Sequence, residues 1–293
     1  KKRIPRLLQP TTYRLNVVKK SGASVPFDPM KIYRSLQNVG VNNETAEIII
    51  RAVALEAYDG ITTKEIYQKT FALLRKYSRG ASVRYRLKDA ISQLGNTGYP
   101  FERYIADLFA EKGYQVKTGI VLPGHAISHE VDVLAMNPDR IFTIECKYHV
   151  NPSSKSDVKV PMYILSRYTD IRNRWEGRDD FKDRHYQQWV ATNTRFTDDA
   201  IAFAEVYGLR ILSWDYPKGE SLRDWIQLYG AYPITCLSCL SRADKNLLVS
   251  KGLVSCRTIH KDTHVLDGLP LPSAKKNLLR KELTYLYDNV LAD

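Results

Sequence analysis

The first hundred residues have the hydrophobic pattern of a mainly helical domain that begins with two short strands. Apolar residues recur at the three- and four-residue spacing of amphipathic helices, and Gly40, Gly60 and Gly80 separate these segments. The predicted helices are 29–39, 43–58, 63–78 and 82–93, and the predicted strands are 15–18 and 25–27. Two glycines, an asparagine and a proline within 94–100 predict a domain boundary.

The central part of the chain alternates between helix and strand patterns. Helical spacing that starts at Phe101 ends at Gly113, and runs of β-forming residues follow. The predicted strands are 114–118, 130–136, 141–148, 189–192 and 210–214, with a helix at 198–207 between the last two. After Tyr229 the pattern is helical again, with a final helix at 274–290. This order predicts an α/β fold.

The composition narrows the class of protein. Of the 293 residues, 44% are hydrophobic and 26% are charged, which is ordinary globular usage. No stretch of eighteen apolar residues is free of charge, and the first residues lack the apolar segment of a signal peptide. Four cysteines are too few for a disulfide framework. We therefore expect a cytoplasmic protein with no membrane partner.

Positive charge is concentrated near one end of the chain. Residues 1–95 contain 18 lysines and arginines against 7 acidic residues, whereas the remaining residues contain 26 against 25. Such a basic segment suits a polyanion, either nucleic acid or a nucleotide phosphate, because the bound cations release condensed counterions. A solvated basic surface that maintains solubility explains the charge equally well.

Two charged strands joined by a short turn, EVDVLA and IFTIECK, carry the candidate chemistry. Antiparallel pairing with Met136 opposite Ile141 would place Asp132 opposite Glu145. The two-residue period of a strand then places Asp132, Glu145 and Lys147 on one face. Facing carboxylates repel, so the pattern predicts a cation between them, and Mg²⁺ suits two oxygen ligands. Lys147 could then orient a water molecule or stabilise negative charge on a phosphate.

A solvated strand face is the alternative interpretation of these charges. In that case the acidic residues and the lysine simply alternate with buried residues such as Val131 and Ile144. Cys146 is expected to be a core residue rather than a nucleophile, because its side chain points away from the charged face. The context favours a functional site, since a helix bearing Glu102 precedes the strands and a strand and helix follow them.

Four segments together resemble the Mrr-like branch of the PD-(D/E)xK restriction endonucleases over about residues 98–215: GYPFERYIADLFAEKGYQV, HEVDVLA, FTIECKYH and ATNTRFTDDAIAFAEVYGLRIL. The resemblance implies a restriction-endonuclease-like α/β core with a mixed sheet, and metal-dependent hydrolysis of DNA. It implies that Asp132 and Glu145 bind Mg²⁺, that Lys147 is the catalytic lysine, and that Glu102 is a further catalytic carboxylate. The approach to Asp132, GHAISHEVD, lacks the family's glycine-rich loop. We interpret its polar residues as structural: His125, His129 and Glu130.

The basic N-terminal block has neither a GxxxxGK[ST] nor a GxGxxG motif. Its segments VVKKSGASVPFDPMKIYRSLQNVG and EAYDGITTKEIYQKT resemble the ATP-cone, a regulatory domain of ribonucleotide reductases. The resemblance implies ATP or dATP as a regulatory ligand, contacted by Val17, Lys19, Lys31, Thr63 and Tyr67. A helix start beside Lys31 would suit a phosphate. The alternatives are a charged hairpin tip at Lys19 and Lys20 and a packed aromatic side chain at Tyr67.

The C-terminal segment contains a cysteine and histidine spacing that zinc sites can use, formed by Cys236, Cys239, Cys256 and His260. The same residues also fit paired short helices with cysteines in an apolar core, which is the interpretation that we prefer. These helices loosely resemble helix-hairpin-helix modules that contact the DNA backbone, although the GxG hairpin is missing.

The combined prediction is a chain with a basic tail and three domains. The predicted bounds are 1–13 for the tail, 14–96 for the ATP-cone-like domain, 97–222 for the nuclease domain and 223–293 for the helical, helix-hairpin-helix-like domain. We expect a Mg²⁺-dependent endonuclease that cuts double-stranded DNA, responds to ATP or dATP, and forms a homodimer or higher homo-oligomer. The alternatives are a nucleotide-responsive DNA-binding regulator with an inactive nuclease fold, and a DNA-repair or junction-resolving nuclease.

Overall fold

The chain divides into two compact units. The computed structural model describes residues 14–19, 21–176, 178, 181 and 184–288. The first unit is Lys1–Arg86 with Thr284–Asp293, and the second is Leu87–Leu283. The basic tail predicted at 1–13 lies outside the described residues. The second unit contains both the central sheet and most of the C-terminal helices, so the boundary between residues 222 and 223 stays a prediction.

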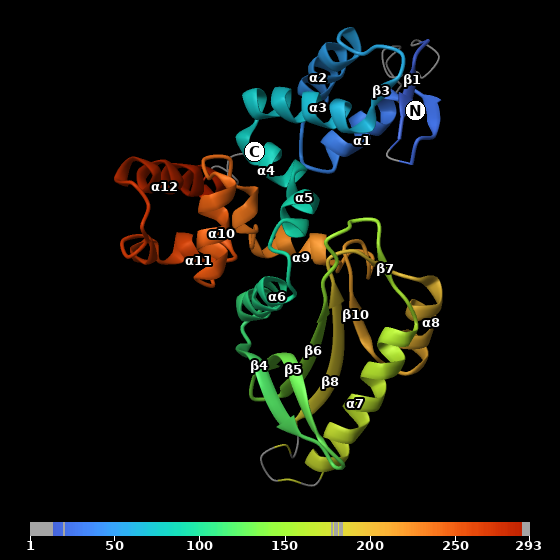
Figure 1. Ribbon diagram of the computed structural model, residues 1–293, viewed down its shortest axis with the longest axis vertical. Helices are drawn as coiled ribbons and strands as arrows, with labels where there is room; N and C mark the ends of the chain where they lie inside the picture. Colours follow the sequence, from blue (N-terminus) through green and yellow to red (C-terminus); the bar gives the residue numbers. More distant parts are fainter. Residues whose placement is uncertain (1–13, 20, 177, 179–180, 182–183, 289–293) are drawn as a thin grey trace. The chain divides into compact units, whose positions relative to one another are not determined.

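The first unit combines a small sheet with packed helices (Figure 1). Its strands are β1 (Asn16–Val18), β2 (Ser24–Pro26) and β3 (Ile61–Thr62), and its helices are α1 (Pro29–Gln37), α2 (Asn43–Leu55), α3 (Thr63–Tyr77) and α4 (Arg79–Tyr85). Strand β1 lies between its neighbours, antiparallel to β2 and parallel to β3. The three helices predicted between residues 29 and 78 are therefore present, and β3 is a strand that the sequence pattern did not reveal.

Helix starts in this unit are set by short polar side chains. The Asp28 carboxylate accepts a hydrogen bond from the backbone amide of Met30 at 3.0 Å, and Pro29 occupies the first turn. Thr62 and Glu65 form a reciprocal capping box at the start of α3. Behind these caps the helices bury a common apolar core that includes Leu36, Ile49, Ile50, Ile61 and Leu74.

The single helix predicted at 82–93 is instead two short helices. Helix α4 ends at Tyr85 and α5 (Leu87–Ser92) begins two residues later. The backbone amide of Arg86 is shared between the carbonyl groups of Ser82 and Val83, a three-centre bond typical of a helix end. The apolar pattern continues across this break, which is why it predicted one helix.

The second unit is built on a five-stranded mixed sheet with the order β10-β8-β6-β5-β4. These strands are β4 (Gln115–Pro123), β5 (Ser128–Met136), β6 (Arg140–Lys147), β8 (His185–Thr192) and β10 (Arg210–Leu212). Strands β4, β5 and β6 are antiparallel neighbours, whereas β6, β8 and β10 are parallel. A separate parallel pair consists of β7 (Lys155–Ser156) and β9 (Arg195–Phe196). The predicted α/β fold with a mixed sheet is confirmed.

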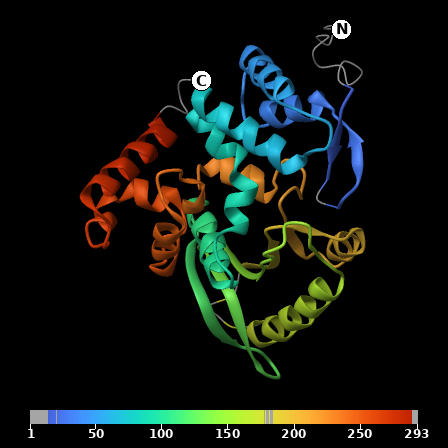
Figure 2. The same ribbon diagram turned by 45° about the horizontal axis from the view of Figure 1, so that its top comes forward.

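Helices cover both faces of this sheet (Figures 1 and 2). They are α6 (Tyr99–Glu111), α7 (Lys159–Trp175), α8 (Asp198–Val206) and α9 (Leu222–Tyr229). Ile164 of α7 shares an apolar cluster with Val190 of β8. On the other face Phe109 of α6 packs edge-on against Trp189, with ring centroids 5.7 Å apart, and against Trp225 of α9. Because Trp189 and Val190 are consecutive in one strand, α6 and α7 lie on opposite faces of the sheet.

Helix α7 is the largest element that the sequence analysis missed. Its buried residues are few and widely spaced, Pro161, Ile164, Ile171 and Trp175, and they lie among many charged and polar residues. The preceding segment is rich in serine and proline and predicts a loop. The strand predicted at 114–118 is also too short, because β4 continues through Gly119 to Pro123.

The C-terminal part of the second unit is helical, as predicted. Its elements are the short 3₁₀ segments η3 (Ile234–Cys236) and η4 (Thr263–Leu266), the helices α10 (Arg242–Ser250) and α11 (Cys256–Lys261), and α12 (Ser273–Asp288), whose last residues, from Thr284 on, belong to the first unit. The side chains of Cys236 and Cys256 are buried. Within the described ranges, no helix is both long and apolar enough to cross a membrane.

Candidate functional site

Strands β5 and β6 separate at the predicted carboxylates. The predicted register is confirmed for four pairs, from Met136 opposite Ile141 to Val133 opposite Ile144. The pairing stops there, so Asp132 and Glu145 are not a cross-strand pair as expected. On the other side of β5, Asp132 falls between two paired positions of β4, at Gly119, whose φ is +59°.

The irregularity at Asp132 shows in the packing of β5. Val131 and Leu134 belong to the same apolar cluster as Ile171 and Trp175 of α7, although a regular strand would place residues three apart on opposite faces. The strand therefore changes its facing near Asp132. This local change, which a strict two-residue period cannot predict, turns the Asp132 side chain toward β6.

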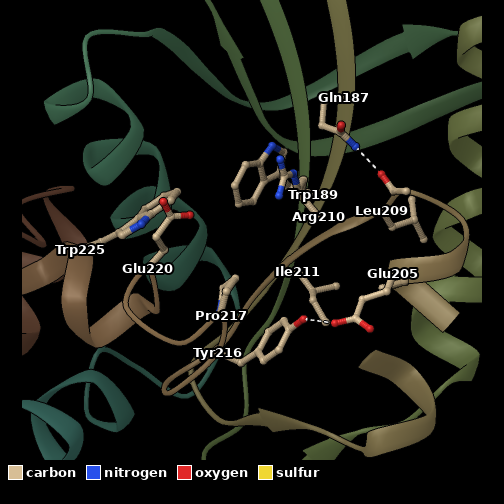
Figure 3. Close-up of a pocket in the computed structure, with 12 residues that line it drawn as sticks. Gln187, Trp189, Glu205, Leu209, Arg210, Ile211, Tyr216, Pro217, Glu220 and Trp225 are labelled. Atoms are coloured by element: carbon tan, nitrogen blue, oxygen red, sulfur yellow. Dashed lines mark hydrogen bonds between the residues drawn. The ribbon is translucent and has the colours of Figure 1, made fainter. Parts of the chain in front are cut away.

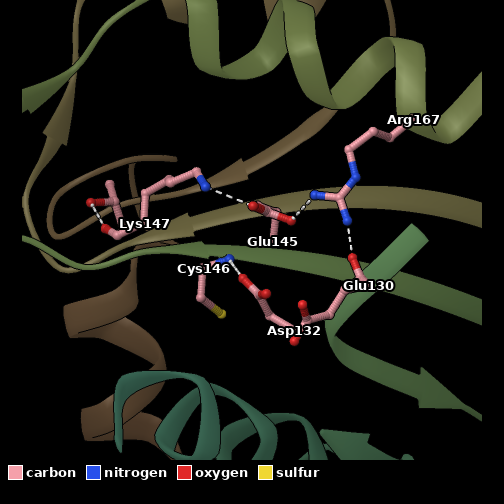
Figure 4. Close-up of polar contacts among 7 residues, drawn as sticks. Glu130, Asp132, Glu145, Cys146, Lys147 and Arg167 are labelled. Carbon is pink, nitrogen blue, oxygen red and sulfur yellow. Dashed lines mark hydrogen bonds and ion pairs between the residues drawn. The ribbon is translucent and has the colours of Figure 1, made fainter. Parts of the chain in front are cut away.

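The Asp132 carboxylate is held against the backbone of β6 (Figure 4). Its Oδ2 accepts a hydrogen bond from the backbone amide of Cys146 at 2.7 Å. Burial, and after it the nearby Glu145 carboxylate, raise the pKa of Asp132 to about 6. The Cys146 amide, Lys147 and Arg167 oppose this rise. Near neutral pH, Asp132 is thus an anion whose charge the surrounding protein only partly compensates.

Glu145 is buried and bonded to two cations. Its Oε1 lies 2.6 Å from Nζ of Lys147, and its Oε2 lies 2.8 Å from Nη1 of Arg167. The second terminal nitrogen of Arg167 donates to the backbone carbonyl of Glu130, as Figure 4 shows. Sequence reasoning missed Arg167 because its helix, α7, was not predicted. The negative charge of Glu145 is thus compensated by two protein cations, Lys147 and Arg167, as a buried carboxylate requires.

Glu102 reaches the same region from α6. It lies in the first turn of that helix, which begins after Gly98 without a side-chain cap. Burial, together with the carboxylates of Asp132, Glu130 and Glu145, raises the pKa of Glu102 to about 7. Helix α6 packs against β5, so Glu102 belongs to a different element from the carboxylates of β5 and β6.

The donor set suits a hard divalent cation with few protein ligands. The described residues contain no group of three or more His, Cys, Asp or Glu side chains arranged as a metal site. Mg²⁺ is often held by one or two carboxylates and several water molecules, so Asp132 and Glu145 would satisfy it. Glu145 would bind the ion with oxygens that also bond Lys147 and Arg167. The charge of Asp132 is less fully compensated by the protein, so a bound cation would stabilise its ionised form.

Polar residues at the end of β8 and directly after it fix the end of β6. The Thr192 hydroxyl donates to the backbone carbonyl of Lys147 at 2.7 Å. The Asn193 side chain accepts from the His149 amide and donates to the His149 carbonyl, both at 2.8 Å. Thr192 and Asn193 thus position the strand that carries Glu145 and Lys147, a role that their place in a family resemblance does not predict.

The two histidines before Asp132 both contact Asp170, through different groups. The His129 ring bonds Oδ2 of Asp170, on α7, at 2.7 Å, and the His125 backbone amide donates to the Asp170 carbonyl. The same carboxylate accepts from the amides of Ala126 and Ile127. Asp170 therefore organises the β4–β5 loop. These contacts agree with the structural interpretation of His125 and His129.

The proposed nucleotide residues lie in the first unit. Val17 is a buried residue of β1, whereas Lys19, Lys31 and Thr63 are exposed. The pairing of Val18 with Thr62 brings the ends of β1 and β3 together, so Lys19 and Thr63 leave adjacent strands. Lys31 lies in the first turn of α1.

Tyr67 packs within the same unit. Its ring stacks on that of Tyr85, with centroids 5.1 Å apart and planes 17° from parallel. This packing corresponds to the alternative that the sequence left open for Tyr67. Its role toward a nucleotide base stays a prediction.

A cavity of about 380 Å³ lies between β8, β10, α8 and α9 (Figure 3). Aromatic side chains of Trp189, Tyr216 and Trp225 line it, together with the carboxylates of Glu205 and Glu220. The Tyr216 hydroxyl donates to Glu205 at 2.6 Å. This cavity is separate from the carboxylates of β5 and β6, since none of them is among its lining residues.

The four candidate zinc ligands are not arranged as a metal site, because the described part of the chain has no suitable cluster of three. Burial raises the pKa of the Cys256 thiol well above its usual value. Glu282 of α12 accepts hydrogen bonds from the backbone amides of Ser238 and Cys239. The preferred interpretation, cysteines packed between short helices, agrees with this arrangement.

Two segments of the chain match known protein families. The sequence model of the ATP cone domain matches residues 15–88, and a model described as AF1548-like, C-terminal, matches residues 232–287. An uncharacterised protein of Archaeoglobus fulgidus is 33% identical over 158 residues, which are 53% of this chain and 83% of that protein. The chain therefore belongs to the family of this archaeal protein and contains an ATP-cone domain at its N-terminal end.

Two solved structures resemble parts of this chain. The crystal structure of the protein of unknown function AF1548 is 28% identical, covers 67% of this chain and 99% of that one, and has a TM-score of 0.53. The MspJI restriction endonuclease in complex with a 27-mer oligonucleotide covers 72% of this chain and 44% of its own, at 13% identity and a TM-score of 0.31. A score this low does not establish a common fold.

Proposed function

We propose that the second unit is a Mg²⁺-dependent endonuclease of the Mrr-like PD-(D/E)xK type that hydrolyses phosphodiester bonds in double-stranded DNA. One observation carries the proposal: Asp132, Glu145 and Lys147 meet where β5 and β6 separate. Glu102 of α6 is electrostatically coupled to them. A mixed sheet with helices on both faces is compatible with a restriction-endonuclease-like core.

Each residue has a distinct role in this proposal. Asp132 and Glu145 hold the ion, which when bound would polarise a phosphoryl oxygen. The Lys147 side chain is 35% exposed, so its ammonium group can leave Glu145 and donate to a non-bridging phosphate oxygen. Glu102, with a pKa of about 7, is suited to accept a proton from the attacking water near neutral pH.

The ATP-cone domain supplies the proposed regulation. We propose that ATP or dATP binds the first unit through Lys19, Lys31 and Thr63, with Val17 packing beneath. Lys31 in the first turn of α1 is the natural partner of a phosphate. DNA binding should weaken steeply with salt, because lysines and arginines that contact phosphates release counterions. Cleavage of both strands would suit a homodimer.

The test is cleavage of supercoiled plasmid DNA with and without Mg²⁺, using modified and unmodified substrate. We expect nicked or linear product only with Mg²⁺, and loss of this product in Asp132→Asn. Asp139→Asn, in the exposed turn between β5 and β6, is the matched control and should cut like wild type. Cleavage by Asp132→Asn at the wild-type rate would remove the proposed site.

A second candidate is a nucleotide-responsive DNA-binding regulator that has this fold without cleavage activity. The observation that favours it is the pairing of both Glu145 oxygens with Lys147 and Arg167, which leaves the carboxylate neutralised by protein. Such a protein would bind DNA with the same affinity in Asp132→Asn and never cut it. A junction-resolving nuclease shares the chemistry proposed above and would differ in preferring branched DNA in the same assay.

A further inference from the structure

The Glu145 carboxylate is already engaged by two cations that differ in how firmly they are held. Lys147 is on the same strand, two residues away, and its side chain is 35% exposed. Arg167 comes from α7 and its side chain is 14% exposed. Both contacts are charge-assisted hydrogen bonds, at 2.6 Å and 2.8 Å.

Several contacts fix the Arg167 guanidinium in place. One terminal nitrogen bonds Oε2 of Glu145 and the other bonds the carbonyl of Glu130, so the planar group bridges β6 and β5. The guanidinium carbon also lies 5.5 Å from the ring centroid of Tyr163, within range of a cation–π contact. A planar cation with two directed bonds loses little entropy on binding and is displaced less readily than a flexible ammonium group.

We infer that Arg167 is an internal counter-ion that competes with a divalent cation for Oε2 of Glu145. The inference rests on the proposed function, because it assumes that Asp132 and Glu145 are the ion ligands. An oxygen that accepts a strong hydrogen bond has less electron density to offer a metal, and the guanidinium charge repels an approaching cation. The protein is then in a resting state that binds Mg²⁺ weakly until Arg167 moves away.

Two variants of Arg167 separate this effect from a loss of folding. Arg167→Ala removes the charge and both bonds. Arg167→Gln removes the charge but retains a donor for the Glu130 carbonyl, which protects the local fold. Arg174→Ala is the matched control, since Arg174 is an exposed arginine of the same helix and its loss changes the net charge equally.

The measurement is calorimetric titration of the full chain with MgCl₂, with the shift in Tm on adding Mg²⁺ as a second readout that needs no cleavage. We expect both Arg167 variants to bind Mg²⁺ about tenfold more tightly than wild type, the scale of one charge-assisted hydrogen bond. Arg174→Ala should bind like wild type. Asp132→Asn should lose binding.

Two outcomes would contradict the inference in different ways. If the Arg167 variants bind Mg²⁺ as weakly as wild type, or more weakly, while Asp132→Asn abolishes binding, then the ion site stands and the competition does not exist. If Asp132→Asn binds like wild type, or if no protein in the series binds Mg²⁺, then the ion assignment fails and the inference fails with it.

Discussion

At the scale of single residues, the candidate site is a balance between carboxylates and two cations. Glu102 and Asp132 have pKa values raised to about 7 and about 6, chiefly by burial, while Glu145 is paired with Lys147 and Arg167. A cluster of this kind is costly for stability alone, since a buried carboxylate prefers to be protonated. Perturbed carboxyl groups that converge from separate elements are characteristic of functional sites.

Lys147→Ala should abolish DNA cleavage and leave folding and most DNA binding intact. The lysine is the cation of the site that can reach solvent, so it can transfer from Glu145 to a phosphate. Plasmid cleavage, circular dichroism and DNA binding by fluorescence anisotropy measure the three properties. Lys155→Ala, at an exposed residue of β7, is the control. Wild-type cleavage by Lys147→Ala would show that the lysine has no catalytic role.

Mg²⁺ affinity should rise with pH between about 5.5 and about 8, because protons compete with the ion for Asp132, and because deprotonation of the nearby Glu102 adds negative charge that attracts the cation. Calorimetry across this range measures the change. In Glu102→Gln, the Mg²⁺ affinity should change less with pH near pH 7. Its change at lower pH, which is due to Asp132, should remain.

The stability of the ion-free protein should change in the opposite direction. A carboxyl group whose pKa is raised by folding binds more protons in the folded state than in the unfolded state. Its contribution to the free energy of unfolding therefore falls as pH rises from the usual pKa of 4.5 to about 7. The Tm of wild type should drop over this interval by more than that of Glu102→Gln, and equal slopes would contradict the pKa assigned to Glu102.

At the scale of elements, the sequence predicted the strands and the register that follow from a regular hydrophobic alternation. It missed the features that depend on contacts between distant parts of the chain. The register from Met136 to Val133 followed from the turn and the alternation of β5 and β6. The interruption of the β4–β5 pairing at Gly119 did not, because a positive φ at one glycine leaves no mark on the hydrophobic pattern. Helix α7 was missed since its few buried residues lie in a polar, basic segment, and Arg167 was missed with it.

Gly119→Ala should destabilise the second unit by about 1 kcal/mol, the cost of a non-glycine residue in the left-handed region. A methyl group at this position would meet no atom within 4 Å, so the penalty is conformational rather than steric. Denaturant unfolding measures it. Gly119→Asn should cost less, because asparagine adopts this conformation more readily. Identical stability of both variants and wild type would show that β4 does not need the glycine.

At the scale of the whole molecule, an ATP-cone domain and a sheet with converging carboxylates occur in one chain. The family matches cover residues 15–88 and 232–287, so the sheet that carries the candidate site lies between them in sequence. The sequence predicted the α/β class and the N-terminal domain, because both depend on the order of elements rather than on exact contacts. The boundary predicted between the sheet and the C-terminal helices, at residues 222 and 223, stays a prediction.

Calorimetry of the full chain with ATP and with dATP tests the nucleotide proposal. We expect binding of at least one nucleotide and about a tenfold loss of affinity in Lys31→Ala, since a lysine at a helix start forms a charge-assisted bond with phosphate. Lys64→Ala, at an exposed residue in the first turn of α3, is the control. An absence of heat with both nucleotides would remove the sensor role.

The buried thiol of Cys146 has a practical consequence. It lies between Glu145 and Lys147 in sequence, yet burial and the Asp132 charge hold its pKa well above the usual value. Thiolate is the reactive form, so alkylating reagents should ignore this cysteine for as long as β5 and β6 remain closed. The rate at which Cys146 is alkylated, measured by mass spectrometry, would therefore report how often the sheet opens next to the carboxylates. The measurement needs no probe built into the protein.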